Sequence, residues 1–476
     1  MSLGLRRPHE ALDYASLAGF LPPPPDFFEE RFFEPPERIE PPERIEARQL
    51  ARLKEKALMT AAIPFHRRRW NEAGFDPRSI SRLEDLASVP VYTVDDIRRS
   101  IEASPPLGDY QALRLEDARR EPMRVYMSGG TTGTSRPTLY TRWDREAGAI
   151  LTARALYMQG IRPGDVVLNA WSYGTHNGAW AMDEALDHWL NCVVLTTGTG
   201  SVTPSRKQVE LALEYGAKAI LTTGDYLLRL AEIARELGVD PEEDLRLCAL
   251  PNIGDREALE TTFGVPSYAS YGFHEVQWVA VECTARAGLH VFEDAFVVEV
   301  VDPDSGAALP DGEQGSLVVT ELYKTGSPQF RYNIMDLSTR YPREKCACGS
   351  WLRRIAPFAG RADNMVKLRG VNVWPEAVGE IVTAHPKTTT DYFVRAVRSE
   401  NRDDLIVSVV SNAAAKEFES IELELEHALR EKLGLKIAAC VESPGGLDEL
   451  TEVRTSPKPK RFRDERSTSG KEYANR

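Results

Sequence analysis

The sequence predicts an α/β protein with a large N-terminal domain of mixed, largely parallel, helix-covered sheets, an antiparallel β subdomain and a small C-terminal α+β domain. Three patterns lead to this fold class. Short apolar strands alternate with helices from about residue 124 to 281, strand-rich segments joined by a Pro-Asp-Ser-Gly turn follow residue 291, and a new strand and helix pattern begins near Gly360. At 476 residues, the chain is also too long for one compact core.

The first hundred residues combine a proline-rich arm with helices. The stretch "FLPPPPDFFEERFFEPPERIEPPERIEARQL" repeats Pro-Pro-Glu-Arg-Ile-Glu and predicts an irregular arm on the surface, because proline interrupts helices. The pattern becomes helical from Ile45 to Trp70, and two short amphipathic turns are expected around the buried "VPVY". We interpret these residues as scaffold.

The middle of the chain carries the α/β pattern, and ligands of such sheets bind at loops beyond the strand ends. Strands are expected in "DVVLNAW", "CVVLTTG", "KAILTTG" and "LRLCAL", and helices in "REAGAILTARALYMQG", "WAMDEALDHWL", "SRKQVELALEYG" and "DYLLRLAEIARELG". The segments "VFEDAFVVEVVDPDSG" and "QGSLVVTELY" then predict the antiparallel subdomain. The C-terminal unit follows in "NMVKLRGVNVWPEAVGEIVTAH", "TDYFVRAVR", "DDLIVSVVS" and "SIELELEHALREKLG".

Composition and charge exclude several classes of function. A net charge of −13 argues against a nucleic-acid surface, because binding to the phosphate backbone depends on Lys and Arg. No run approaches the roughly 20 apolar residues of a membrane helix, and no export signal is recognisable, so we expect no membrane contact and a cytoplasmic location. Six cysteines in a chain of this length do not suggest a disulfide framework. A small ligand is therefore favoured.

The stretch "MSGGTTGTSRP" is the first candidate site. It places three glycines and five hydroxyl side chains in eleven residues, which suits an anion such as phosphate because backbone N–H groups and hydroxyls can converge on it. It is not a Walker A loop, since no lysine follows Gly133. Composition alone leaves phosphate binding and a flexible surface turn equally open.

Four motifs extend this interpretation to a family. "SGGTTGTSRP", "YASYGFHE", "RYNIMD" and "GRADNMVKLRGVNV" occur in the order of the adenylate-forming enzymes, the superfamily of acyl-CoA synthetases, peptide-synthetase adenylation domains and luciferases, which the chain resembles from roughly Phe32 to Arg466. More narrowly, "GTGSVTPSRKQVEL", "ECTARAGLHVFED", "CACG" and "RGVNVWPEAV" resemble the phenylacetate-CoA ligase branch. The resemblance implies a ligase that converts a carboxylic acid and ATP to acyl-AMP and pyrophosphate, and then forms a thioester with coenzyme A.

The resemblance also assigns roles at the nucleotide. The loop residues would close over the β and γ phosphates, with Arg136 in place of the usual lysine. Glu275 would hold Mg²⁺, and Asp336 would accept hydrogen bonds from the ribose hydroxyls; a solvated surface Glu and an ordinary loop Asp are the alternatives. Tyr271 and Gly272 would form a wall beside the adenine. The loop residues are Ser128, Gly129, Gly130, Thr131, Thr132 and Gly133.

In the same family, a hinge lets the C-terminal domain rotate between the two half-reactions. The resemblance places Arg361 on a phosphate and Asp363 at the hinge, so that residues 1–361 form the large domain that binds ATP and the acid, with an antiparallel subdomain at about 285–355, and residues 362–476 form the mobile domain. Gly370 would let the pantetheine arm of coenzyme A pass. Lys458 would be the catalytic lysine, together with Thr131, Glu275 and Arg361 as catalytic residues; Lys460 is the second choice, and a basic tail without a site is the alternative.

Three cysteines and one histidine suggest a second metal. Cys283, His290, Cys346 and Cys348 offer three sulfurs and one imidazole for a closed, tetrahedral zinc site, and the same positions resemble a metal site in some members of the branch. Four reduced, unconnected residues are the alternative. The zinc would be structural and take no part in the chemistry.

The stretch "NAWSYGTHNGAW" lies where the branch has its substrate loop. The faces of Trp171, Tyr173 and Trp180 favour an aryl acid, and His176 and Asn177 would bond a hydroxyl or amino group on the ring, unless they bond loop backbone instead. His274, where the family commonly has Thr, would bond the α-phosphate or the acid carboxylate, or pack as an ordinary buried ring.

Two other functions stay open for the sequence. The acyl group could pass to a carrier-protein thiol or an amine in place of coenzyme A, or the chain could be a non-catalytic nucleotide-binding homologue. The segment "LCALPNIGD" lacks the glutamate usual at that position of the family, which leaves the identity of the acid undefined. Related folds commonly dimerise, so the resemblance also allows a homodimer.

Overall fold

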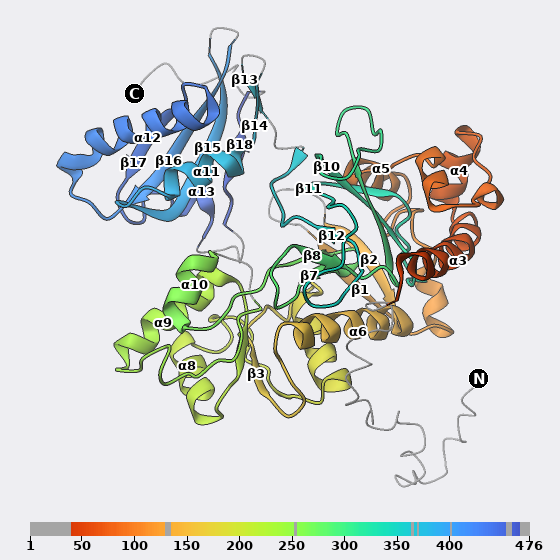
Figure 1. Ribbon diagram of the computed structural model, residues 1–476, viewed down its shortest axis with the longest axis horizontal. Helices are drawn as coiled ribbons and strands as arrows, with labels where there is room; N and C mark the ends of the chain where they lie inside the picture. The colour runs from red at the N-terminus through yellow and green to blue at the C-terminus, as the bar shows by residue number, and fades with distance from the viewer. Residues whose placement is uncertain are drawn as a thin grey trace.

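The computed structural model describes residues 40–128, 135–251, 255–362, 366–368, 371–399, 402–453 and 459–466 (Figure 1). Within these ranges, the hydrophobic core of the C-terminal unit is formed only by residues from Val366 onward, and the remaining large clusters belong to the preceding residues. The chain therefore has a larger N-terminal part and a C-terminal unit with its own core. A domain boundary between residues 361 and 362 stays a prediction.

Helices form the beginning of the described chain, as predicted for residues 45–70. Proline occupies the first helical position of α3 (Pro42–Thr60) and α4 (Pro64–Glu72), where its missing N–H breaks no intrahelical bond. The side chains of Thr93 and Asp96 cap α5 (Val94–Ala103). Three 3₁₀-helices complete this region: Pro77–Ser79, Leu83–Ser88 and Leu115–Arg119.

A three-stranded parallel sheet in the order β4-β3-β5 is covered by helices on both faces. Alternate residues of its strands enter different cores: Val167 and Leu221 pack against α6 and α7, whereas Leu168 and Ile220 pack against α8, α9 and α10. Each of these helices was predicted except α10. The elements are β3 (Val166–Asn169), β4 (Val193–Leu195), β5 (Ala219–Leu221), α6 (Arg142–Met158), α7 (Gly178–Glu184) with its π-helical extension η6 (Ala185–Trp189), α8 (Ser205–Glu214), α9 (Gly224–Glu236) and α10 (Arg256–Phe263).

The parallel part is smaller than predicted. The segment "LRLCAL" contributes only an isolated bridge between Leu250 and Ser267, because Arg246 adopts a left-handed φ of 51° that interrupts the extended backbone. Most strand pairs of the described N-terminal part are antiparallel. Apart from a hairpin at residues 123–141, these pairs begin at Ser270, ahead of the predicted start near residue 285. The mixed α/β class is confirmed, but the prediction that most of the sheet structure is parallel is wrong.

The antiparallel strands form two sheets and a hairpin. One sheet has the order β12-β8-β7-β6 and the other the order β11-β10-β9, while β1 pairs with β2. Figure 1 shows these sheets at the centre of the N-terminal part, between the α3–α5 helices and the α/β layer. The strands are β1 (Met123–Ser128), β2 (Arg136–Thr141), β6 (Ser270–Phe273), β7 (Gln277–Glu282), β8 (Leu289–Val291), β9 (Phe296–Val301), β10 (Gln314–Glu321), β11 (Tyr332–Thr339) and β12 (Arg354–Ile355).

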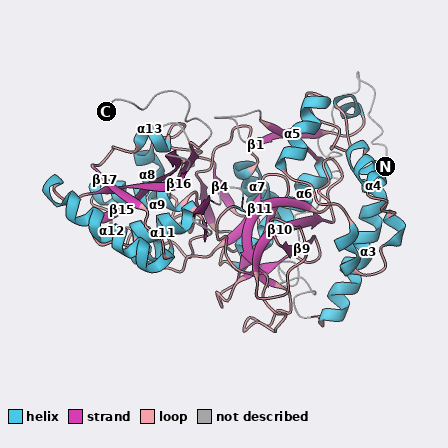
Figure 2. Cartoon of the chain, turned by 90° about the horizontal axis from the view of Figure 1, so that it is seen from above, coloured by secondary structure: helices cyan, strands magenta, loops and turns pink. Residues whose placement is uncertain are grey.

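The C-terminal unit is a mixed four-stranded sheet in the order β17-β16-β15-β18, with a separate hairpin of β13 and β14. Helices α11 and α12 pack against the sheet, and Figure 2 shows them along one side of the strands. This confirms the α+β pattern. The elements are β13 (Val366–Leu368), β14 (Val371–Val373), α11 (Pro375–Thr383), β15 (Thr388–Ser399), β16 (Arg402–Ser411), the 3₁₀-helix Ala415–Glu417, α12 (Phe418–Leu433), β17 (Ala438–Glu442), α13 (Asp448–Thr451) and β18 (Phe462–Asp464). Among the described helices, none has the length and apolar character needed to cross a membrane.

Candidate active site

The structure describes the predicted site residues in part. Ser128, Arg136, Tyr271, Gly272, His274, Glu275, Asp336 and Arg361 are described, and so are the residues predicted to bind the acid or zinc. The other predicted residues lie outside the described ranges, so their roles stay predictions: Gly129, Gly130, Thr131, Thr132, Gly133, Asp363, Gly370 and Lys458.

The predicted ribose carboxylate, Asp336, is held between two partners. On β11, its Oδ2 accepts a hydrogen bond from the Tyr271 hydroxyl at 2.9 Å, and its Oδ1 pairs with Nη1 of Arg361 at 3.1 Å. The preceding residue, Met335, adopts a left-handed φ of 66°, a conformation that costs free energy in a non-glycine residue. Three residues predicted at the nucleotide therefore meet at one carboxylate, although they are far apart in the sequence.

Tyr271 and Gly272 are fixed by the fold itself. The Tyr271 ring is buried in the core, and burial together with the Asp336 carboxylate raises the pKa of its hydroxyl well above the ordinary value. A Cβ on Gly272 would lie 2.1 Å from the carbonyl oxygen of Gln277 on the neighbouring strand. The glycine is thus required by strand packing, and a contact of either residue with adenine stays a prediction.

At the predicted phosphate end, Arg136 and Glu275 form an ion pair. Arg136 begins β2 and Glu275 lies in the turn between β6 and β7, with 3.3 Å between Nη2 and Oε1. Their side chains are 17% and 2% exposed, so the pair is shielded from water. Arg136 lies opposite Ser128 in the β1–β2 pairing, which places the end of the predicted phosphate loop beside the pair.

Several polar atoms around this pair are buried without a hydrogen-bond partner. They include Nε of Arg136, Oγ of Ser128 and the hydroxyl of Tyr332. Burial, followed by the negative charge of Glu275, raises the pKa of the Tyr332 hydroxyl, which therefore stays protonated. Buried polar groups are usually hydrogen-bonded, so this group of donors fits a polar ligand such as a phosphate.

The turn that carries Glu275 is held through its main chain by the segment after β10. Nζ of Lys324 donates to the carbonyl oxygen of Glu275 at 2.7 Å, and the hydroxyl of Tyr323 donates to that of Val276 at 2.9 Å. Burial lowers the pKa of Lys324 to about 8. Sequence reasoning missed Lys324; its position directly after an apolar strand, in "LVVTELYK", was the signal.

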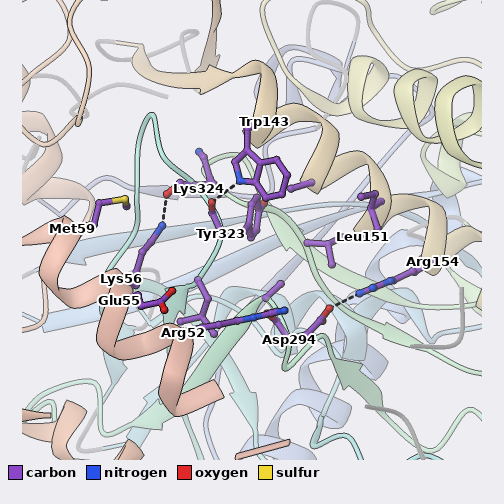
Figure 3. Close-up of a pocket in the computed structure, with 14 residues that line it drawn as sticks. Arg52, Glu55, Lys56, Met59, Trp143, Leu151, Arg154, Asp294, Tyr323 and Lys324 are labelled. Carbon is purple, nitrogen blue, oxygen red and sulfur yellow. Dashed lines mark hydrogen bonds and ion pairs between the residues drawn. The ribbon is translucent and has the colours of Figure 1, made fainter. Parts of the chain in front are cut away.

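Tyr323 and Lys324 also line a cavity of about 480 Å³ between α3 and α6 (Figure 3). Lys56 of α3 pairs with Glu321 at 2.9 Å in its wall, and Arg154 of α6 pairs with Asp294 at 2.6 Å. None of the predicted site residues that the structure describes lines this cavity. Its contribution to the site is the wall that supports Glu275.

The predicted substrate loop brings His176 and Asn177 next to His274. Nδ2 of Asn177 donates to the carbonyl oxygen of His274 at 2.8 Å and to the Tyr140 hydroxyl at 3.3 Å, and the rings of His176 and His274 are 5.1 Å apart. Both ring nitrogens of His274 are buried without a hydrogen-bond partner. Burial, with a smaller effect from His176, lowers the pKa of His274 to about 2, so this imidazole is neutral.

The aromatic residues of the loop pack mainly against protein. Trp180 lies between the Tyr173 ring at 5.2 Å and the Arg124 guanidinium at 4.7 Å. The Tyr173 hydroxyl donates to Asp183 at 2.9 Å, and Trp171 packs against the core between α6 and α7. These contacts explain why the residues are aromatic, and their contact with an acid stays a prediction.

The predicted zinc ligands lie together. One ligand atom from each of Cys283, His290, Cys346 and Cys348 falls within 4.8 Å of all the others. The sulfurs of Cys283 and Cys346 are 3.8 Å apart, and Sγ of Cys348 is 3.5 Å from Nε2 of His290. Hydrogen bonds from Cys283 and then His290 hold the pKa of the Cys348 thiol far below its usual range, in spite of burial. Three sulfurs and one imidazole in this arrangement fit tetrahedral zinc.

Comparisons with known proteins identify the family of the chain. The family model of the AMP-binding enzyme C-terminal domain matches residues 370–466. A phenylacetate-coenzyme A ligase of Thermus thermophilus is 35% identical over 409 residues, which cover 82% of this chain and 89% of that protein. The chain belongs to the phenylacetate-CoA ligase branch of the adenylate-forming enzymes. A phenylacetate-coenzyme A ligase of Aromatoleum evansii is 30% identical over 403 residues, or 82% of this ligase and 88% of that one. The enzyme class predicted from the sequence, an AMP-forming acid–CoA ligase, is confirmed.

Solved structures of a 2-hydroxyisobutyryl-CoA ligase share the fold of this ligase. The structure in the postadenylation state matches with a TM-score of 0.80 and 25% identity over 94% of both chains. The same enzyme in the thioesterification state, with CoA, covers 91% of this ligase and 92% of that chain with 26% identity, and its TM-score is only 0.65. Since both structures are of one enzyme, the two TM-scores show that this ligase is more similar in overall shape to the postadenylation structure than to the thioesterification structure.

Proposed function

We propose that this ligase adenylates an aromatic carboxylic acid bearing a hydroxyl or amino substituent and then transfers the acyl group to coenzyme A. The acid carboxylate attacks the α-phosphate of ATP and releases pyrophosphate, and the thiol of coenzyme A then displaces AMP from the acyl-AMP. The aromatic acid is supported by the curated relatives, which are phenylacetate-coenzyme A ligases. The polar substituent is supported by the site residues.

The observation that carries the substituent is the buried imidazole of His274. A neutral imidazole has one N–H donor and one acceptor nitrogen, and leaving both unpaired away from water costs free energy. The main-chain carbonyl of His274 accepts hydrogen bonds from Tyr140 and Asn177, which hold the backbone from which the buried ring projects. Because the N–H groups of Asn177 are engaged there, His274 and His176 are better placed than Asn177 to bond the substituent.

The remaining residues serve the ATP. Asp336 would accept the ribose hydroxyls, while Arg136 and Arg361 would neutralise phosphate oxygens as charge develops. Glu275 would hold Mg²⁺, which supplies further charge neutralisation when bound. Lys458 would bring an ammonium to the acid carboxylate and α-phosphate, and rotation about Asp363 would then withdraw it before the thiol attacks.

A second candidate substrate is a small hydroxy acid. Among the structural neighbours is a 2-hydroxyisobutyryl-CoA ligase, and the His274 ring would bond an aliphatic hydroxyl as well as one on an aromatic ring. Passing the acyl group to a carrier-protein thiol or an amine remains the alternative for the second step, since it would use the same adenylation residues.

We also propose that the Cys283, His290, Cys346 and Cys348 cluster holds a structural zinc. Four protein ligands would fill the coordination sphere and leave no open position for a substrate. Because Cys283 follows β7, His290 lies on β8 and the other two cysteines precede β12, the metal would join the strands of one sheet.

The experiment for the acid is pyrophosphate release, with ATP and Mg²⁺, from benzoate, phenylacetate, salicylate, anthranilate and 2-hydroxyisobutyrate in turn. We expect the substituted aromatic acids to give the highest kcat/KM. We also expect His274→Phe to lower kcat/KM more for the substituted acids than for benzoate. A clear preference for unsubstituted phenylacetate would refute the substituent. Pyrophosphate release without a thioester on adding coenzyme A would favour the other acceptors.

A further inference from the structure

The ion pair between Arg136 and Glu275 conflicts with the separate roles of its two members. Under the proposed function, Arg136 contacts phosphates and Glu275 holds Mg²⁺, yet in the structure the two charges neutralise each other at 3.3 Å. A carboxylate that pairs with a guanidinium offers less charge to a metal ion, and the guanidinium offers less charge to a phosphate. The pair must therefore separate before either ligand is fully bound.

The contacts around the pair indicate which side chain moves. Two hydrogen bonds fix the main chain of the Glu275 turn: Lys324 donates to the carbonyl oxygen of Glu275, and Tyr323 donates to that of Val276. Tyr323 and Lys324 both belong to the cavity wall in Figure 3. The Glu275 side chain is almost fully buried. Arg136 is the more exposed partner, has a longer and more flexible side chain, and its Nε has no hydrogen-bond partner. Separation therefore moves Arg136.

We propose that Arg136 is an exchangeable counter-ion for Glu275. Before the ligands bind, Arg136 neutralises the buried carboxylate. When ATP and Mg²⁺ enter, Glu275 would hold the metal and Arg136 would move to the phosphates. This proposal rests on the proposed function of the site. It makes Arg136 a phosphate-binding residue whose contact with ATP depends on the metal.

The exchange has a consequence for ATP without metal. If Arg136 moved to the phosphates alone, it would leave the Glu275 carboxylate buried, unpaired and close to negative phosphate, which is costly. Arg136 therefore stays on Glu275, and ATP without Mg²⁺ loses the arginine contact. Replacing Glu275 by neutral glutamine should free Arg136 for the phosphates even without metal.

The test measures binding of ATP and of inorganic pyrophosphate to the full chain by equilibrium dialysis with EDTA. We expect Glu275→Gln to bind both at least about tenfold more tightly than wild type. The double variant Glu275→Gln, Arg136→Met should return to within about twofold of wild type. The gain in affinity should persist in about 1 M salt, because the Debye length there is only about 3 Å and a direct Arg136–phosphate contact is screened less than distant charges are. The gain should be absent for AMP, which lacks the β and γ phosphates.

Four outcomes would overturn the exchange: no gain in affinity in Glu275→Gln, a gain that survives Arg136→Met, a gain that vanishes in high salt, or a gain that appears equally with AMP. Circular dichroism checks that each variant folds, and Arg136→Gln replaces Arg136→Met if the latter does not. ATP binding by wild type with Mg²⁺ shows whether a negative result refutes the exchange alone or the proposed function as well. If it binds ATP while the variants fail, only the exchange is wrong; if it binds no ATP, the proposed function is wrong as well.

Discussion

Replacing Asp336 by asparagine should weaken ATP binding without unfolding the protein. The carboxylate accepts one hydrogen bond from Tyr271 and one from Arg361, and the proposed function adds the ribose hydroxyls. Asparagine keeps the shape but loses the negative charge and one acceptor oxygen. A hydrogen bond to a charged group contributes about 1.5–3 kcal/mol, so losing one should raise the Kd for ATP about 10- to 150-fold.

The assay is ATP binding by calorimetry together with the KM for ATP in acid-dependent pyrophosphate exchange. Both should rise in Asp336→Asn, while the KM for the acid stays near that of wild type, because the acid is predicted to lie at the other end of the site. Asp311→Asn is the matched control, since Asp311 is likewise held by two side chains, those of Arg340 and Arg353, but is not a predicted ligand contact. An unchanged Kd in folded Asp336→Asn, or an equal loss in Asp311→Asn, would refute the assignment.

Three further predictions concern the metal, the pH dependence and the lysine. Cys346→Ser should remove the zinc measured by mass spectrometry and lower the Tm, whereas the control Cys440→Ser should change neither; equal zinc in both variants would contradict the site. Buried His66 has a pKa lowered to about 3 in the folded state from 6.5, so its contribution to stability is present above pH 6.5 and is lost as the pH falls toward 3. The loss amounts to about 2 kcal/mol of unfolding free energy between pH 6.5 and 4.5. Chemical denaturation of His66→Phe should show a correspondingly flatter pH profile, and an unchanged profile would contradict the prediction. Lys458→Ala should slow adenylation strongly in a pyrophosphate-exchange assay, and Lys460→Ala should do so far less because Lys460 pairs with Glu452; the reverse order would exchange their roles.

Local elements could be predicted from the sequence where one periodicity dominates. The amphipathic spacing of α8, α9 and α12 and the apolar runs of β3, β4 and β5 are properties of neighbouring residues. The failure at "LRLCAL" has a different origin. Its apolar residues suit a strand, but the left-handed backbone at Arg246 and the position beside β5 depend on tertiary packing, which periodicity does not report.

The site shows the same division. The motifs predict Asp336 and Glu275 as ligand residues. The cysteine and histidine spacing predicts a cluster, and the structure brings its ligand atoms within 4.8 Å of one another. The ion pair of Glu275 and the hydrogen bond of Asp336 could not be predicted from the sequence. Arg136 and Glu275 are 139 residues apart, and Tyr271 and Asp336 are 65 apart, so only the folded chain joins them.

The most direct test of the proposed function is a competition for coenzyme A. An equimolar mixture of phenylacetate, benzoate, salicylate, anthranilate and 2-hydroxyisobutyrate is incubated with ATP, Mg²⁺ and limiting coenzyme A, and the thioesters are quantified by mass spectrometry, so that their early ratios equal the ratios of kcat/KM. We predict that salicylyl- or anthraniloyl-CoA exceeds phenylacetyl-CoA at least about tenfold, because unpaired buried groups discriminate against a substrate that lacks the hydrogen bond. A mixture dominated by phenylacetyl-CoA, or one without any thioester, would contradict the account.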